Sequence, residues 1–157
     1  MNKHRVFEII CVVFLAAFIL FMSSGDSYSD KTVDEVFEFL PQSAEFKEFQ
    51  KIGKNKIKEE FGFEFDSIDS FVYYASDSVM TVDELMIIKL KENAKADDIT
   101  EKIEQRVKEK QILFEGYAPE QSALLKNYAL SYKDGFIFYC VSENSTDAMI
   151  YFLESLK

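Results

Sequence analysis

Apolar residues recur at steps of three and four from Asp97 to Tyr117, and charged residues fill most of the other positions. This spacing is typical of an amphipathic helix and predicts the longest helix of the chain, with one apolar stripe. The stripe consists of Ile99, Ile103, Val107, Phe114 and Tyr117. Because such a stripe needs a flat apolar partner, the pattern also predicts a sheet that lies against this helix.

Two strand-like runs precede this helix. Residues 70–75 are aromatic and β-branched, a composition that favours a strand. Residues 84–91 alternate, with Met86, Ile88 and Leu90 on one face, and therefore predict a second strand. The polar residues 76–83 between the two runs are expected to form a loop.

The clearest local signal is a hairpin after the helix. Asp134-Gly135 lies between two strand-like runs, residues 128–133 and 136–142, and this dipeptide is typical of a type I′ turn. The turn predicts a register in which one core face holds three pairs: Tyr132 with Ile137, Leu130 with Tyr139, and Tyr128 with Val141. The other face of this hairpin is only half polar.

Short helices are expected around these strands. Thr32 and Glu35 form a capping box, and Pro41 ends the helix that they start. Further short helices are predicted from Ser43, from Asn55 to Phe61 before Gly62, from Pro119, and from Asn144–Thr146 to Leu156. The last of these is expected to reach the same sheet face as the long helix.

Together these elements predict an α+β fold. It consists of a four-stranded, mainly antiparallel sheet in β-β-α-β-β-α order, with the Asp97 and Thr146 helices on one face. The short N-terminal helices are expected to pack at an edge or on the second face.

The N-terminus has the pattern of an export signal. Met1 to Arg5 is basic and Ile9 to Met22 has no charge, which is typical of a signal peptide or a short membrane anchor. We therefore expect a leader at residues 1–25, a linker at 26–31 and a single domain at 32–157. This domain would be extracytoplasmic, either anchored in the cell membrane or secreted, and the pattern leaves cleavage and retention of the leader open.

The charge and the histidine content exclude several classes of function. A net charge of −10 disfavours binding to nucleic acid. Because His4 is the only histidine and precedes the uncharged run of the leader, catalysis by a Ser-His-Asp or Cys-His pair and zinc binding by histidine are excluded for the domain. No cofactor motif is present, and neither Asp66–Asp69 nor Asp97-Asp98 has the spacing of a calcium loop. Cys140 is expected to be a small buried hydrophobic residue.

Two places are candidate interaction surfaces. One is the junction from Phe114 to Glu120, where Tyr117 and Glu120 are the candidate residues; the alternative is a packed corner. The other is the second face of the sheet, which holds Leu85, Ile87, Phe136 and Phe138. If the N-terminal helices do not cover this second face, it would form an apolar patch large enough to bind a partner or a second copy of the chain.

Several short motifs resemble a known family in their order and spacing. They are Tyr73-Tyr74-Ala75-Ser76, Val82-Asp83-Glu84-Leu85, Lys89-Leu90-Lys91, the helix with Arg106, the Phe114–Glu120 junction, the turn at Gly135, and Val141-Ser142. The resemblance covers roughly Thr32 to Leu156 and is to the domain of unknown function 4358 family, small exported proteins and lipoproteins of Gram-positive bacteria. It implies an extracytoplasmic location but no activity, substrate or site. Unlike its lipoprotein members, this chain has no cysteine at a lipidation position.

We therefore expect an extracytoplasmic interaction module without catalytic activity. Its partner would be an unknown extracytoplasmic protein or a second copy, and an uncleaved leader would add contact with the membrane. One alternative is a domain that binds a small ligand or peptide through loop 76–82 and the tyrosine-rich strands. The other is a carboxylate-dependent enzyme acting on cell-wall polymers, which would need two carboxylates across a groove.

Overall fold

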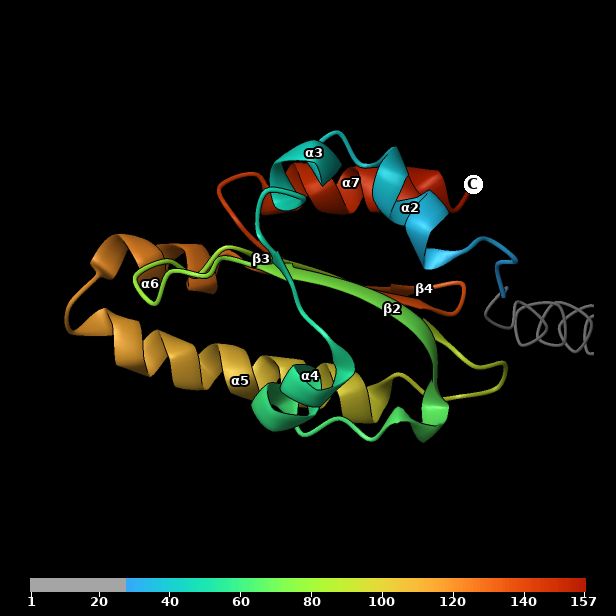
Figure 1. Cartoon of the computed structure of the whole chain (residues 1–157), viewed down its shortest axis with the longest axis horizontal. Helices are drawn as coiled ribbons and strands as arrows, with labels where there is room; N and C mark the ends of the chain where they lie inside the picture. The colour runs from blue at the N-terminus through green and yellow to red at the C-terminus, as the bar shows by residue number, and fades with distance from the viewer. Residues whose placement is uncertain (1–27) are drawn as a thin grey trace, which may run out of the picture.

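A computed structural model describes residues 28–157 of the chain, which form one antiparallel sheet between two layers of helices (Figure 1). The expected leader and the first two residues of the expected linker lie outside the described residues. The strands are β1 (Gln50–Lys51), which has only two residues, β2 (Ile68–Ala75), β3 (Glu84–Leu90), β4 (Ala129–Lys133) and β5 (Phe136–Val141). They lie in the sheet in the order β1-β2-β3-β5-β4. The α+β class is thus confirmed, but within residues 28–157 the sheet has five strands rather than four.

The helices fall into two groups. On one face of the sheet lie α4 (Lys54–Phe61), α5 (Asp97–Glu115) and α6 (Pro119–Lys126); on the other lie α2 (Val33–Phe39), α3 (Ser43–Phe46) and α7 (Ser145–Ser155) (Figure 1). A single 3₁₀ turn, η1 (Phe65–Ser67), leads into β2. The expectation that α5 and α7 share a face is therefore wrong.

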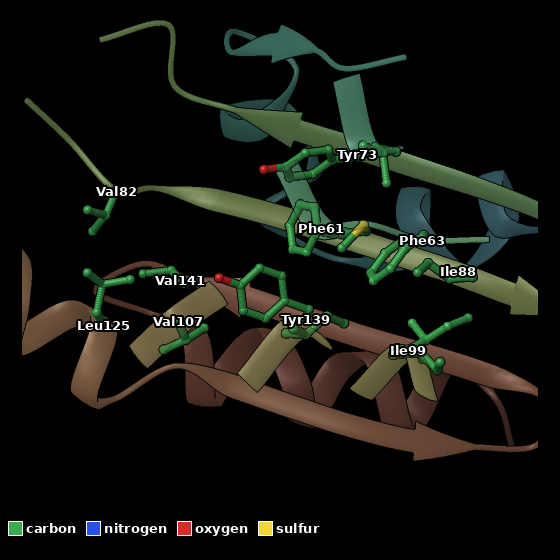
Figure 2. Close-up of a cluster of buried hydrophobic side chains, with 14 of the residues drawn as sticks. Phe61, Phe63, Tyr73, Val82, Ile88, Ile99, Val107, Leu125, Tyr139 and Val141 are labelled. Atoms are coloured by element: carbon green, nitrogen blue, oxygen red, sulfur yellow. The ribbon is translucent and has the colours of Figure 1, made fainter. Parts of the chain in front are cut away.

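The layer that contains α5 encloses the larger hydrophobic core. Ile99, Ile103, Val107 and Phe114 are buried, as their helical spacing predicted. Figure 2 shows Ile99 and Val107 among the side chains of this cluster, beside Tyr139 of β5. The fifth member of the predicted stripe, Tyr117, is instead 56% exposed, because α5 ends at Glu115.

The opposite layer covers the second face of the sheet. Phe152 of α7 stacks on Phe138 of β5 with ring centroids 4.9 Å apart, and Phe37 of α2 stacks on Tyr74 of β2 at 5.1 Å. Both faces of β5 are apolar, so a helix is needed on each face to exclude water. For this reason α7 takes the second face rather than joining α5.

The predicted hairpin is confirmed. Asp134 and Gly135 have φ angles of 50° and 86°, as a type I′ turn requires, and Tyr132 pairs with Ile137 and Leu130 with Tyr139. The third predicted pair does not form within β4, which begins at Ala129.

The predicted ends of three helices are also confirmed. At the start of α2, the Glu35 backbone N–H donates to the Thr32 hydroxyl at 3.2 Å, and the Thr32 N–H donates to the Glu35 carboxylate at 2.7 Å. Gly62 ends α4 in the left-handed conformation, with φ 67°, and Pro119 begins α6. The short helix predicted from Ser43 is present as α3, with Ser43 as its first residue. Among the described helices, none has the length and apolar character needed to cross a membrane.

Candidate functional site

The most unusual chemical feature of the core is a buried carboxylate. Glu84 is the first residue of β3 and is 1% exposed. Its two oxygens accept hydrogen bonds from the hydroxyls of Tyr73 and Tyr139, each at 2.6 Å, and from Arg106 Nη1 at 2.7 Å. Lys110 Nζ is 3.3 Å away. The carboxylate therefore has four donors around it.

Glu60 of α4 completes this group, which we call the Glu84 cluster: Glu60, Tyr73, Glu84, Arg106, Lys110 and Tyr139. The second nitrogen of the Arg106 guanidinium lies 3.0 Å from the Glu60 carboxylate, and the guanidinium packs on the ring of Phe61 at 4.2 Å. Figure 2 shows the ring of Phe61 between those of Tyr73 and Tyr139, whose hydroxyls point the same way. Arg106 thus joins α4, α5 and β3.

The charges of the cluster hold Glu84 in its ionised form. Burial alone would raise the pKa of Glu84, but the positive charges of Arg106 and Lys110 and the hydrogen bonds outweigh this effect and lower the pKa to about 2. Burial lowers the pKa of Lys110, despite the attraction of Glu84. Burial also raises the pKa of Tyr73 and Tyr139, and the negative charge of Glu84 adds to this shift. Both phenols therefore remain neutral donors.

This arrangement supports structure rather than catalysis. The two carboxylates of the cluster balance the charge of its two cations. Both oxygens of Glu84 already accept hydrogen bonds. A general acid or base must exchange a proton with a substrate, and its pKa must lie near the working pH. Glu84 has neither property, so the cluster fixes α4 and α5 on the sheet.

Sequence reasoning missed this cluster, although a signal was present. Glu84 is in phase with Met86 and Ile88 on the buried face of β3, and Arg106 and Lys110 lie on the apolar side of α5. A single acid on one apolar face and two bases on the other indicate a buried ion pair. Sequence alone could not show that the two faces meet.

The structure separates the predicted interaction residues into two groups. Tyr117 and Glu120 are exposed, at the junction of α5 and α6. Leu85, Ile87, Phe136 and Phe138 are each 0% exposed, because α2, α3 and α7 cover the second sheet face. These four residues therefore form core rather than surface, which was the alternative considered for that face.

Around Tyr117, apolar side chains are unusually exposed. Ile112 is 75%, Leu113 66% and Tyr117 56% exposed, and we call these three residues the corner surface. The ring of Tyr117 packs on the buried Phe114, with centroids 5.1 Å apart, so its position is fixed. At the same end of the molecule lies the β2–β3 loop, where Val79 and Met80 are exposed (Figure 1).

The described chain begins at the opposite end of the sheet, in a segment that we call the entry strap (residues 28–31). The Tyr28 hydroxyl donates to the Leu90 carbonyl at 2.9 Å, and the Ser29 N–H donates to the Asp134 carbonyl at 2.9 Å. The nearly buried Lys89 donates to the Lys31 carbonyl at 2.8 Å. The described part of the expected linker is therefore bound to the domain.

Among the cavities of residues 28–157 are three with volumes of about 650, 490 and 280 Å³. The largest of these three is lined by Tyr28, Tyr132, Gly135 and residues 91–97. A smaller one, of about 280 Å³, is acidic and includes Glu45, Asp83 and Glu143. Burial raises the pKa of Asp83, and the neighbouring Glu45 and Glu143 charges raise it further.

The described residues offer little for metal or thiol chemistry. Within residues 28–157, no group of three or more His, Cys, Asp or Glu side chains is placed to hold a metal ion. Cys140 is fully buried, and burial raises the pKa of its thiol to about 12. The expectation of a small buried hydrophobic residue is thus confirmed for Cys140.

One comparison with known proteins gives a result. The model of the family described as "Domain of unknown function (DUF4358)" matches residues 42–142, which include all five strands of the sheet, α5 and the Glu84 cluster. No curated protein and no solved structure is significantly similar to the chain.

Proposed function

The chain belongs to the DUF4358 family, and we propose that it is an extracytoplasmic interaction module without catalytic activity. In this proposal, the N-terminal segment directs export and either anchors the domain in the membrane or is removed. The domain then binds another extracytoplasmic protein through the corner surface.

The exposure of the corner surface is the observation that carries this proposal. Two neighbouring aliphatic side chains, Ile112 and Leu113, are 75% and 66% exposed although a hydrophobic core lies one helix face away. Single exposed apolar residues are common, but a group of them beside an ordered aromatic ring is typical of a binding surface. Their position on the well-packed helix α5 would present them rigidly.

The position of the entry strap supports the same proposal. Five residues, 23–27, separate the uncharged run from Tyr28 and can span at most about 18 Å when fully extended. A retained leader would therefore hold the Tyr28 end of the domain near the membrane. The corner surface, at the opposite end (Figure 1), would then point away from the membrane.

The largest cavity favours a second candidate function, the binding of a small ligand or peptide. Its volume of about 650 Å³ falls in the usual range of ligand sites, and it has two tyrosines, Tyr28 and Tyr132, among its lining residues. It lies away from loop 76–82, where the sequence suggested such a site. The other alternative, a carboxylate-dependent enzyme, gains no comparable support. Glu84, whose pKa is lowered to about 2, is enclosed by four donors.

Site-specific photocrosslinking on intact cells tests the proposal. A benzophenone amino acid replaces Tyr117 in the corner surface or, as a matched control, Tyr151, a 37% exposed tyrosine on α7. We expect a discrete covalent adduct with another protein from position 117 but not from position 151. Equal adducts from both positions, or none from 117, would contradict the proposal.

A further inference from the structure

The charged residues named around the corner surface are three acids and two lysines. Glu109 lies one helical turn before Leu113 on α5, and Glu120 is the second residue of α6, three residues after Tyr117 in the chain; both are exposed. Glu115 is also exposed, but its carboxylate pairs with Lys126 at 3.5 Å. Lys108 is the remaining cation beside this surface on α5. The rim therefore presents an excess of negative charge around an apolar centre.

Gly116 leaves the backbone accessible beside this centre. It lies between Leu113 and Tyr117 in the chain, is exposed, and has no atom within 4 Å of the position that a Cβ would occupy. The position therefore opens on solvent, and a partner can approach the backbone closely there.

Two occupants of the surface are disfavoured by charge. A second copy of this chain would bring one acidic rim against another, and each chain has a net charge of −10. A membrane rich in anionic lipid would be repelled in the same way. A basic partner would instead be attracted.

We infer that the corner surface binds a segment of another protein that presents adjacent apolar side chains flanked by lysine or arginine, such as one face of a basic amphipathic helix. This inference rests on the proposed function and specifies its partner. The apolar side chains of the segment would cover Ile112, Leu113 and Tyr117, and one of them would approach the exposed backbone at Gly116. Its basic side chains would face Glu109 and Glu120.

Crosslinking of the full chain on its own cells, from the benzophenone at position 117, also tests this inference. The crosslinked segment of the partner is identified by mass spectrometry and its sequence is read. We expect adjacent apolar residues with lysine or arginine within one helical turn. A segment without basic residues, or a second copy of this chain, would overturn the inference and leave the interaction module standing. The absence of any adduct would overturn both.

Two variants separate charge from shape. E109K/E120K reverses the rim, and we expect the crosslinking yield to fall about tenfold; E48K/E154K makes the same change in net charge at exposed sites elsewhere and should leave the yield unchanged. Gly116→Gln adds a side chain in the open space beside the corner surface, at an ordinary helical backbone conformation, so the chain should fold with an unchanged melting temperature and lose the adduct. Gly53→Gln, at another glycine with open space, is the control. An undiminished yield in either test variant would overturn the inference.

Discussion

At the scale of single residues, the Glu84 cluster shows how a charged group can be kept inside a small core. A buried ion pair gains little over well-packed apolar residues, but removal of one partner leaves the others desolvated and unpaired. Arg106 shares its guanidinium between Glu84 and Glu60, so neither carboxylate can be lost without consequence. The cluster therefore stabilises the fold only as a complete group.

The substitution Glu84→Gln tests this view. The neutral amide would remove the carboxylate that pairs with Lys110 and with one nitrogen of Arg106, which would keep only Glu60, and we expect the free energy of unfolding at pH 7 to fall by about 3–5 kcal/mol. Urea unfolding followed by circular dichroism measures this loss. Glu154→Gln, at an exposed position on α7, should unfold at the wild-type midpoint. If Glu84→Gln also did so, the cluster would not stabilise the fold.

Lowering the pH should remove the stabilisation that the ionised Glu84 gives to the fold. The pKa of Glu84 is about 2 in the folded protein, below its ordinary value of 4.5, so the folded state binds the proton less readily than the unfolded state. The stabilisation is complete above pH 4.5 and is lost as the pH falls from 4.5 through about 2. We expect the difference in unfolding free energy between wild type and Glu84→Gln to shrink over this window, by roughly 3 kcal/mol. A difference that stays constant from pH 6 to pH 2.5 would contradict the assignment.

At the scale of elements, local signals were predictable and pairings between distant elements were not. The Asp134-Gly135 turn, the Thr32–Glu35 capping box and four of the five residues of the predicted α5 stripe depend on neighbours within a few residues, and the structure confirms them. The position of α7 depends on which face of β5 is not covered by another helix. The sequence does not show this, because both faces of β5 are apolar. The strand β1 has only two residues, too few to show the alternating pattern that indicates a strand. The meeting of Glu84 with Arg106 and the exposure of Tyr117 likewise depend on the assembled fold.

The position of α7 on the second face leads to a prediction about Phe152. Its ring is fully buried against Phe138, so Phe152→Ala should leave a cavity and lower the free energy of unfolding by about 3–5 kcal/mol. Ile150→Ala, at a 48% exposed position on the same helix, should have little effect. Thermal unfolding of the two variants provides the measurement. Similar losses in both would show that α7 does not pack as described.

Contact between the entry strap and the β4–β5 turn leads to a prediction about Gly135. A Cβ at this residue would lie 2.7 Å from the ring of Tyr28, and its φ of 86° disfavours any other residue. Gly135→Ala should therefore lower the free energy of unfolding by roughly 1–3 kcal/mol. In a Tyr28→Ala background the clash is removed, and the same substitution should cost less. Strictly additive losses in this double-mutant cycle would show that the strap does not contact the turn.

At the scale of the whole molecule, the two ends of the domain differ in chemistry. The entry strap, the β4–β5 turn and the start of α5 share one end, and the corner surface and the β2–β3 loop share the other (Figure 1). The 19 residues of α5 separate these ends by about 28 Å. Hydrogen bonds fix the strap to the sheet at Leu90 and Asp134, so a retained leader, as proposed above, would join the domain at this end.

This orientation can be measured on the full chain reconstituted in lipid vesicles. Cys11 is replaced by serine, and a fluorophore is attached to a cysteine placed at Lys133, beside the strap, or at Leu113, in the corner surface. Because residues 23–27 can span only about 18 Å, a quencher on the lipid headgroups should quench the fluorophore at position 133. The fluorophore at position 113 should remain unquenched. Equal quenching at the two positions would mean that the domain rotates freely about its attachment. Stronger quenching at 113 would mean that the corner surface faces the lipid, and a protein partner could then no longer be its occupant.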